Sequence, residues 1–141
     1  MKIIDATGGV VGRMASSIAK QVLNGNEVVV LNIEKSVFSG EAKMITAKYY
    51  RRRQMQQKSN PAHTAKWPRR PDMLFKTIVE RMLPKRTSRS KDALAKLRVY
   101  IGTPEEFVGK ETEKMEKKLA CRTVSLEEVC SSLGWKCDVN G

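Results

Sequence analysis

The sequence predicts an α/β fold with a parallel sheet, and three consecutive segments near its start carry that prediction. Residues 2–6 read as a short strand, and residues 11–22 repeat Val, Ala and Ile at helical spacing with polar residues on the other side. Residues 28–33 are apolar almost without interruption, which is typical of a strand covered on both faces. A strand, a helix and a strand in this order form a βαβ unit with parallel strands and a right-handed crossover.

The middle of the chain predicts two longer helices joined by an extended loop. A helix is expected over about residues 42–56, and its second half is so polar that we expect it to project from the core. Residues 58–70 show no apolar period and contain two prolines, which favours an extended loop. Pro71 suits the first position of the next helix, and Pro84 ends it.

The remaining elements are shorter. We expect a basic loop over residues 85–91, a short helix through Ala93, Leu94 and Leu97, a strand over 98–101, and a charged, solvated segment over 109–118. Thr103-Pro104-Glu105-Glu106 and Ser125-Leu126-Glu127-Glu128 have the form of helix-starting capping boxes. With 141 residues and no internal repeat, we expect one domain over 1–141, with residues 43–98 as its basic half and 105–141 as its C-terminal segment.

Positive charge is concentrated in one half of the sequence. Residues 43–98 hold 17 Lys and Arg against three acidic residues, a net charge of +14, whereas the whole chain carries +12. The rest of the chain therefore carries a net charge of −2. A positive field of this density requires a polyanion, and nucleic acid is the most common one in cells.

The same half contains all but one of the candidate binding residues. The exception is Arg13, at the start of the first predicted helix, for which helix packing is an alternative to contact with the RNA backbone. The cations of the basic half alternate with aromatic rings, which stack on unpaired bases or pack against sugars. Arginine and lysine would neutralise phosphates, while His63 and Trp67 would stack or wedge; packing of Trp67 within the protein is an equal alternative. The predicted RNA-binding residues are Arg13, Lys48, Arg51, Arg52, Arg53, Lys58, His63, Lys66, Trp67, Arg69, Arg70, Arg81, Lys85, Arg86, Arg89 and Lys91.

Other classes of function find little support. The turn Thr7-Gly8-Gly9-Val10-Val11-Gly12 lies between a strand and a helix, but Thr7 occupies a position where the dinucleotide fingerprint requires glycine. We interpret it as a tight turn with close helix–strand packing, and we expect no catalytic residue, cofactor or metal. Cys121, Cys130 and Cys137 lack zinc or disulfide spacing. No apolar run spans a membrane and the start is not a secretory leader, so we expect a cytoplasmic protein.

Four ordered blocks of residues form a recognisable pattern along the chain. They are Ile4-Asp5-Ala6-Thr7 with Gly12-Arg13-Met14-Ala15-Ser16; Val28-Val29-Val30-Leu31-Asn32-Ile33-Glu34-Lys35 with Ser39-Gly40; Pro68-Arg69-Arg70-Pro71-Asp72 with Met82-Leu83-Pro84-Lys85; and Ala93-Leu94-Ala95-Lys96-Leu97-Arg98-Val99-Tyr100-Ile101-Gly102. Together these blocks resemble the large-subunit ribosomal protein L-thirteen family, in its archaeal and eukaryotic branch.

The resemblance implies a three-layer α/β/α sandwich around a small parallel sheet, with the basic helix and loop as an extension. It also implies a structural, ribosome-bound protein that binds large-subunit ribosomal RNA during assembly and afterwards, beside neighbouring ribosomal proteins. Two alternatives remain open from the residues alone: a nucleotide-binding α/β enzyme that uses the Gly8–Gly12 turn, and a free RNA- or DNA-binding regulator.

Overall fold

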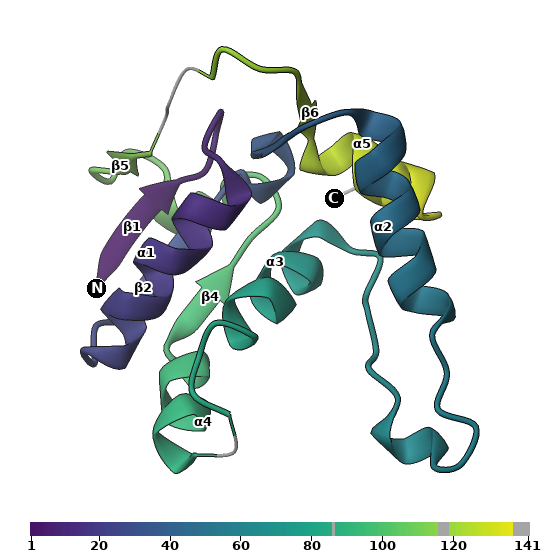
Figure 1. The fold of residues 1–141 in the computed structure, drawn as a ribbon. Coiled ribbons are helices and arrows are strands. Elements are labelled where there is room, and N and C mark those ends of the chain that lie inside the picture. Colours follow the sequence, from purple (N-terminus) through teal and green to yellow (C-terminus); the bar gives the residue numbers. More distant parts are fainter. Residues whose placement is uncertain (86, 116–118, 137–141) are drawn as a thin grey trace.

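In the residues that the computed structural model describes, 1–85, 87–115 and 119–136, a four-stranded parallel sheet forms the centre of the fold (Figure 1). Its strands are β1 (Lys2–Asp5), β2 (Val28–Leu31), β4 (Leu97–Val99) and β5 (Glu113–Lys114), in the order β4-β2-β1-β5. Each neighbouring pair is parallel. The helix α1 (Val11–Leu23) connects β1 to β2, which confirms the predicted βαβ unit.

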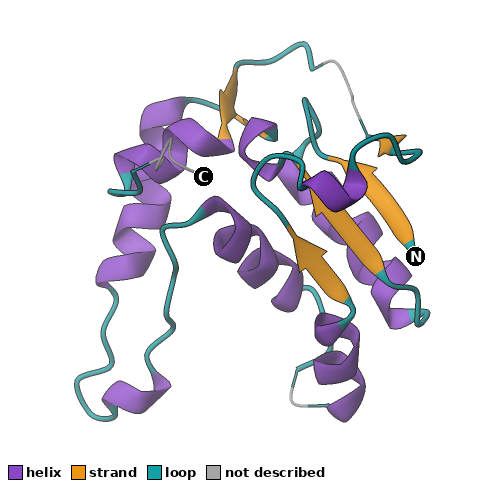
Figure 2. Ribbon diagram, turned by 180° about the vertical axis from the view of Figure 1, so that it is seen from behind, coloured by secondary structure: helices purple, strands orange, loops and turns teal. Residues whose placement is uncertain are grey.

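Helices cover one face of this sheet. The apolar side of α1 is buried, and α3 (Pro71–Glu80) packs beside it with Leu74 and Phe75 fully buried. Seen from behind, the strands lie in front of α1 (Figure 2). On the opposite face, Phe107 of the 3-10 helix η3 (Glu105–Phe107) packs against Val29 and Leu31. The predicted α/β sandwich is confirmed, and within the described residues its second outer layer is this one short turn.

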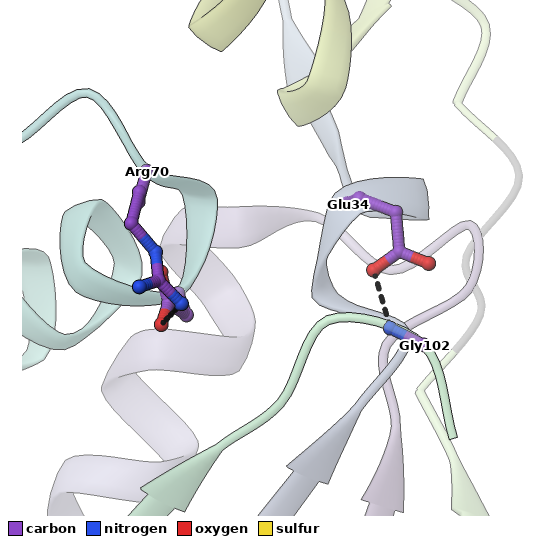
Figure 3. A network of polar contacts seen from close by, with 4 residues as sticks. Glu34, Arg70 and Gly102 are labelled. Atoms are coloured by element: carbon purple, nitrogen blue, oxygen red, sulfur yellow. Dashed lines mark hydrogen bonds and ion pairs between the residues drawn. The ribbon is translucent and has the colours of Figure 1, made fainter. Parts of the chain in front are cut away.

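Polar residues at the carboxyl edge of the sheet connect the strand ends through hydrogen bonds. The carboxylate oxygen Oδ1 of Asp5 accepts hydrogen bonds from the backbone and hydroxyl of Thr7 and from the side-chain amide of Asn32. The backbone N–H of Gly102 donates to Glu34 Oε2 over 3.1 Å (Figure 3). Asn32 itself has a left-handed backbone, with φ of 53°. These contacts tie the ends of β1, β2 and β4 to one another.

The glycine-rich turn after β1 is explained by packing. A Cβ placed on Gly9 would lie 2.5 Å from the sulfur of Met14 and 3.2 Å from the carbonyl oxygen of Ala6. Met14 is a buried residue of α1, so the absence of a side chain at Gly9 allows helix and strand to approach. The interpretation as close helix–strand packing is confirmed.

The C-terminal segment joins the core through a second, smaller sheet. Strand β6 (Thr123–Ser125) pairs antiparallel with β3 (Val37–Ser39), and helix α5 (Leu126–Ser132) follows at once. The Ser125 side chain accepts a hydrogen bond from the backbone N–H of Glu128, so this predicted helix cap is confirmed. Leu126, Val129 and Cys130 are fully buried in the same apolar cluster as α1.

Three sequence predictions are wrong in detail. Residues 88–91 are not loop: helix α4 (Ser88–Ala95) begins there, because the Thr87 side chain caps its first turn. Thr103 does not cap a helix, because its hydroxyl donates to the side chain of Asn32 and only η3 follows. Leu97 does not belong to the short helix, because it begins strand β4 beside β2. In segment 109–118, Glu113 and Lys114 are exposed, as predicted for a solvated segment, and they pair with β1 as β5; residues 116–118 lie outside the described residues.

Candidate nucleic-acid interface

The basic half of the chain forms a projecting limb. We call residues 42–70 the α2 limb: helix α2 (Ala42–Gln54), then a loop that turns at the 3-10 helix η2 (Pro61–His63) and returns to α3. The limb extends away from the sheet (Figure 1). Lys48 and Arg51 on α2 are exposed, as predicted for a projecting basic helix.

The other two arginines of the 51–53 run are held within the protein. The Arg53 guanidinium donates to the backbone carbonyl of Trp67 over 2.6 Å. The guanidinium carbon of Arg52 lies 4.8 Å from the centre of the Trp67 ring and 5.6 Å from that of Tyr49. Both arginines are half-buried. The prediction that the whole second half of α2 is too polar to bury is therefore wrong, because these side chains fasten the returning loop to the helix.

Trp67 has the protein-packed arrangement of the two predicted alternatives. Its side chain is only 7% exposed, and Tyr49, at 6%, contacts it edge-on with ring centres 5.7 Å apart. Arg81, the residue that ends α3, adds a second guanidinium 4.1 Å from the indole centre. Burial raises the pKa of the Tyr49 hydroxyl against the opposing charge of Arg52. The Trp67 ring is therefore a packing centre on which cations are oriented.

The tip of the limb presents polar groups to solvent. Lys58, His63 and Lys66 are exposed. The side chain of Asn60 accepts a hydrogen bond from the backbone N–H of Ala62, which starts η2, and the backbone of Gln57 donates to the Thr64 hydroxyl across the loop. These contacts bend the chain back so that the tip cations lie on one hairpin.

The arginines before α3 differ in their surroundings. Arg70 forms an ion pair with Asp72 in the first turn of α3, with 3.0 Å between the charged atoms (Figure 3). Arg69 runs along the backbone at Gly134, where a Cβ would lie 3.5 Å from its guanidinium. Both side chains remain exposed. Arg70 is thus partly neutralised by a partner, whereas no ion pair of Arg69 occurs among the described residues.

A second projection is formed by α4 and the turn before it (Figure 1). Lys85, Arg89 and Lys91 are exposed there, and Arg86 lies outside the described residues. Arg89 donates to the carbonyl of Leu23, the last residue of α1, over 3.3 Å. A cation at this end of a helix is favourable because the helix dipole is negative there. Arg89 therefore also fastens α4 to α1.

Arg13 and Lys48 are distant in sequence but line one hollow of about 430 Å³ at the start of α1. Its other walls are residues of α1, β3, α2 and α3, among them Gly12, Phe38 and Tyr49. The first turn of α1 carries no acidic residue and its N-cap makes no side-chain hydrogen bond. Two cations beside the positive end of a helix dipole suit an anion such as a phosphate.

Lys66, Arg81 and Lys85 come together in a groove between the returning limb, α3 and the start of α4. One part of this groove has a volume of about 500 Å³ and includes these three cations. Sequence reasoning selected the cations but missed the neutral and acidic walls, Thr77 and Glu80, because only the helical packing of α3 brings them to face Lys66.

Three further observations on the described residues concern metal binding, membrane insertion and thiol reactivity. No group of three or more His, Cys, Asp or Glu in the described ranges is arranged to hold a metal ion. None of the helices described is long and apolar enough to cross a membrane. Cys130 is buried, and burial together with the Asp72 charge raises the pKa of its thiol to about 12, so the thiol stays protonated.

Comparison with known proteins identifies the family. The family model for ribosomal protein L13 matches residues 1–106. The chain belongs to this family. The large ribosomal subunit protein uL13 of Archaeoglobus fulgidus is 39% identical over 140 residues, covering 95% of this chain and 88% of the relative. That of Aeropyrum pernix is 41% identical over 142 residues, covering 95% and 90%, and that of Methanocaldococcus jannaschii 35% over 138 residues, covering 96% and 99%.

The family assignment confirms the resemblance found in the four sequence blocks, and the relatives named here are archaeal. Proteins of the L13 family are structural ribosomal proteins and not enzymes, so the enzyme alternative is excluded. The Gly8–Gly12 turn accordingly needs no nucleotide to explain it, since Gly9 is required for packing.

Proposed function

We propose that this L13-family protein is a structural constituent of the large ribosomal subunit that binds and positions large-subunit ribosomal RNA, during assembly and in the mature particle. It would act in the cytoplasm, bound to the ribosome and adjacent to other ribosomal proteins. The names of its relatives place them in the large subunit, and the charge distribution of this chain suits an RNA partner.

The single observation that carries the proposal is the arrangement of the exposed cations. Lys48, Arg51, Lys58, Lys66 and Lys91 are exposed on two projections, the α2 limb and α4, that extend from one compact sheet and helix layer. Phosphates of two RNA segments would each meet one projection, while the sheet holds the projections at a fixed separation. Recognition would rest mainly on RNA shape, because an A-form major groove hides the base edges.

The salt dependence of RNA binding tests whether the two projections contact phosphates, an arrangement that we call the phosphate clamp. If about eight cations contact phosphates, a plot of log K against log salt for the matching ribosomal RNA fragment has a slope of roughly −6 to −7. Substitution of exposed Arg51 by Ala should flatten this slope by about 1. The matched control is Lys2→Ala, since Lys2 is exposed at the start of β1, on the opposite side of the molecule from α2. A slope near zero overturns the proposal.

Sedimentation separates this function from that of a free regulator. In a gradient of cell extract, the protein should travel with the large ribosomal subunit. A protein confined to the light fractions, together with loss of binding to the RNA fragment, would favour the regulator. The two measurements address different steps, since sedimentation reports residence on the particle and the salt slope reports the phosphate contacts.

A further inference from the structure

We infer that the groove beside Trp67 holds one unstacked nucleotide of the bound RNA; this inference rests on the function proposed above. The groove consists of two adjoining hollows that share Lys66, Thr77 and Glu80 as lining residues. One hollow measures about 500 Å³ and the other about 470 Å³. Each is within the range of volumes that enclose small organic ligands.

The two hollows differ in chemistry as the two ends of a nucleotide do. The first is cationic, with Arg81, Pro84, Lys85 and Ser90 in addition to the shared residues. The second is largely apolar, with walls formed by Trp67, Pro68, Met73, Lys76 and Leu94. A phosphate suits the first hollow, and the flat apolar surface of a base suits the second, where side chains replace the neighbouring bases of a stack.

One cation of the groove, Arg81, is oriented before any ligand arrives. Arg81 lies over the Trp67 ring at 4.1 Å, and the ring is itself fixed by Tyr49 and by the bond from Arg53 to the Trp67 carbonyl. An arginine held in this way loses less conformational entropy when it meets a phosphate. Met73 at the other end is 53% exposed although it is large and apolar. A base that covered Met73 would remove this apolar surface from water.

Glu80 favours a ligand that brings hydrogen-bond donors into the groove. It lines both hollows, is exposed, and has no ion-pair partner among the residues that the structure describes. A carboxylate in an RNA-binding groove repels phosphate, so its useful partner is a hydrogen-bond donor at the junction of base and sugar. Base N–H groups and the ribose 2′-hydroxyl are such donors, whereas an acidic peptide would bring further carboxylates against Glu80.

Two synthetic chains that carry the same charge and differ only in one base test whether the groove binds a base. One is a seven-unit ribose-phosphate chain with a single guanine at its centre, and the other is the same chain with no base; both carry a fluorescent end label. Binding to the full-length protein is measured by fluorescence anisotropy at one salt concentration. The guanine should tighten binding about tenfold, because stacking of one base on protein side chains has that effect. The ratio of the two affinities cancels the phosphate contribution.

Matched variants locate the effect. Met73→Ala and Glu80→Gln should each reduce the tenfold ratio to about threefold or less, while Met44→Ala should leave it unchanged, because Met44 is 71% exposed but lies outside the groove. Met73 and Glu80 are exposed, so their substitution does not disturb the core.

The outcomes separate the inference from the proposed function. Equal affinities for the two chains, or a ratio that neither variant reduces, overturn the nucleotide groove, while salt-dependent binding of the base-free chain leaves the phosphate clamp intact. Displacement of the guanine chain by a seven-residue polyglutamate at equal concentration would overturn the inference in favour of an acidic protein segment. Failure of both chains and of the ribosomal RNA fragment to bind would remove the function and the inference together.

Discussion

The guanidinium carbon of Arg81 lies 4.1 Å from the centre of the Trp67 ring, although the two residues belong to different elements. Arg52 meets the same ring at 4.8 Å, and Arg53 donates to the Trp67 carbonyl. One indole therefore joins α2, the returning loop and the end of α3. The cations at this junction stabilise the fold and also belong to the candidate RNA surface. Substitutions at the junction therefore test folding stability and RNA binding separately.

Trp67→Ala should destabilise the protein by about 3–5 kcal/mol, because a large buried ring is replaced by a cavity. Trp67→Phe should cost less, since an aromatic ring remains beside Tyr49 and the arginines. Urea unfolding followed by circular dichroism measures both. Met44→Ala, on the exposed side of α2, is the control and should stay within about 0.5 kcal/mol of the parent. A Trp67→Ala protein as stable as this control would show that the ring does not support the limb.

The strands and helices around the sheet could be predicted because their apolar patterns are local. The period of α1 and the continuous apolar run of β2 each follow from consecutive residues, and both are confirmed. Strand β5 could not be predicted in this way, because Glu113 and Lys114 are charged and exposed and pair with β1 only through contacts distant in sequence. The start of helix α4 was predicted too late in the chain, because Thr87 caps the helix without a Glu three residues later.

The same distinction applies to the binding surface. Charge density selected residues 43–98 as the candidate binding half of the chain, but composition treats Arg51, Arg52 and Arg53 alike. Their different roles follow from the helical turn, which directs Arg52 and Arg53 toward Trp67 in the returning loop and leaves Arg51 exposed. Likewise, Asp5, Asn32 and Glu34 stand out as motif residues in the sequence, yet only the structure shows that they bind the strand ends to one another.

Cys130 should resist alkylation in the folded protein. Burial raises the pKa of its thiol to about 12, so at about pH 8 the reactive thiolate is scarce and enclosed. Exposed Cys121 is the internal reference. Brief treatment with iodoacetamide followed by peptide mass spectrometry should find the label on Cys121 and not on Cys130, and both should react in guanidinium chloride. Labelling of both cysteines at the same rate without denaturant would contradict the buried position of α5.

Asp5 should make stability depend on acid pH. Burial opposes its charged form, but the hydrogen bonds from Thr7 and Asn32 and the charge of Lys114 outweigh burial and lower the pKa below its usual 3.8. A group with a lowered folded-state pKa stabilises the fold above its unfolded pKa and loses this contribution as the pH falls through the folded value. Asp5→Asn should therefore cost about 1–3 kcal/mol near neutral pH.

The cost of Asp5→Asn should shrink as the pH falls below 3.8, because the parent carboxylate is then protonated as well. Thermal unfolding of both proteins over a series of pH values measures this convergence. Glu111→Gln, at an exposed position, controls for the general effect of removing one acid from a basic protein. A cost that stays constant down to the lowest pH would mean that the charge on Asp5 is irrelevant to the strand ends.

Arg51→Ala and Arg53→Ala should separate RNA binding from folding, although the two residues are close in the same helix. Arg51 is exposed, so its loss should reduce the salt slope of RNA binding by about 1 and leave the unfolding free energy within about 0.5 kcal/mol. Arg53 donates a charged hydrogen bond to the Trp67 carbonyl, so its loss should cost about 1.5–3 kcal/mol of stability. Arg53→Lys should restore little, because an ammonium group lacks the planar fork of the guanidinium. If instead Arg51→Ala destabilised the fold and Arg53→Ala did not, the arrangement of α2 against the returning loop would be wrong, and the cations assigned to RNA would need to be chosen again from the opposite side of the helix.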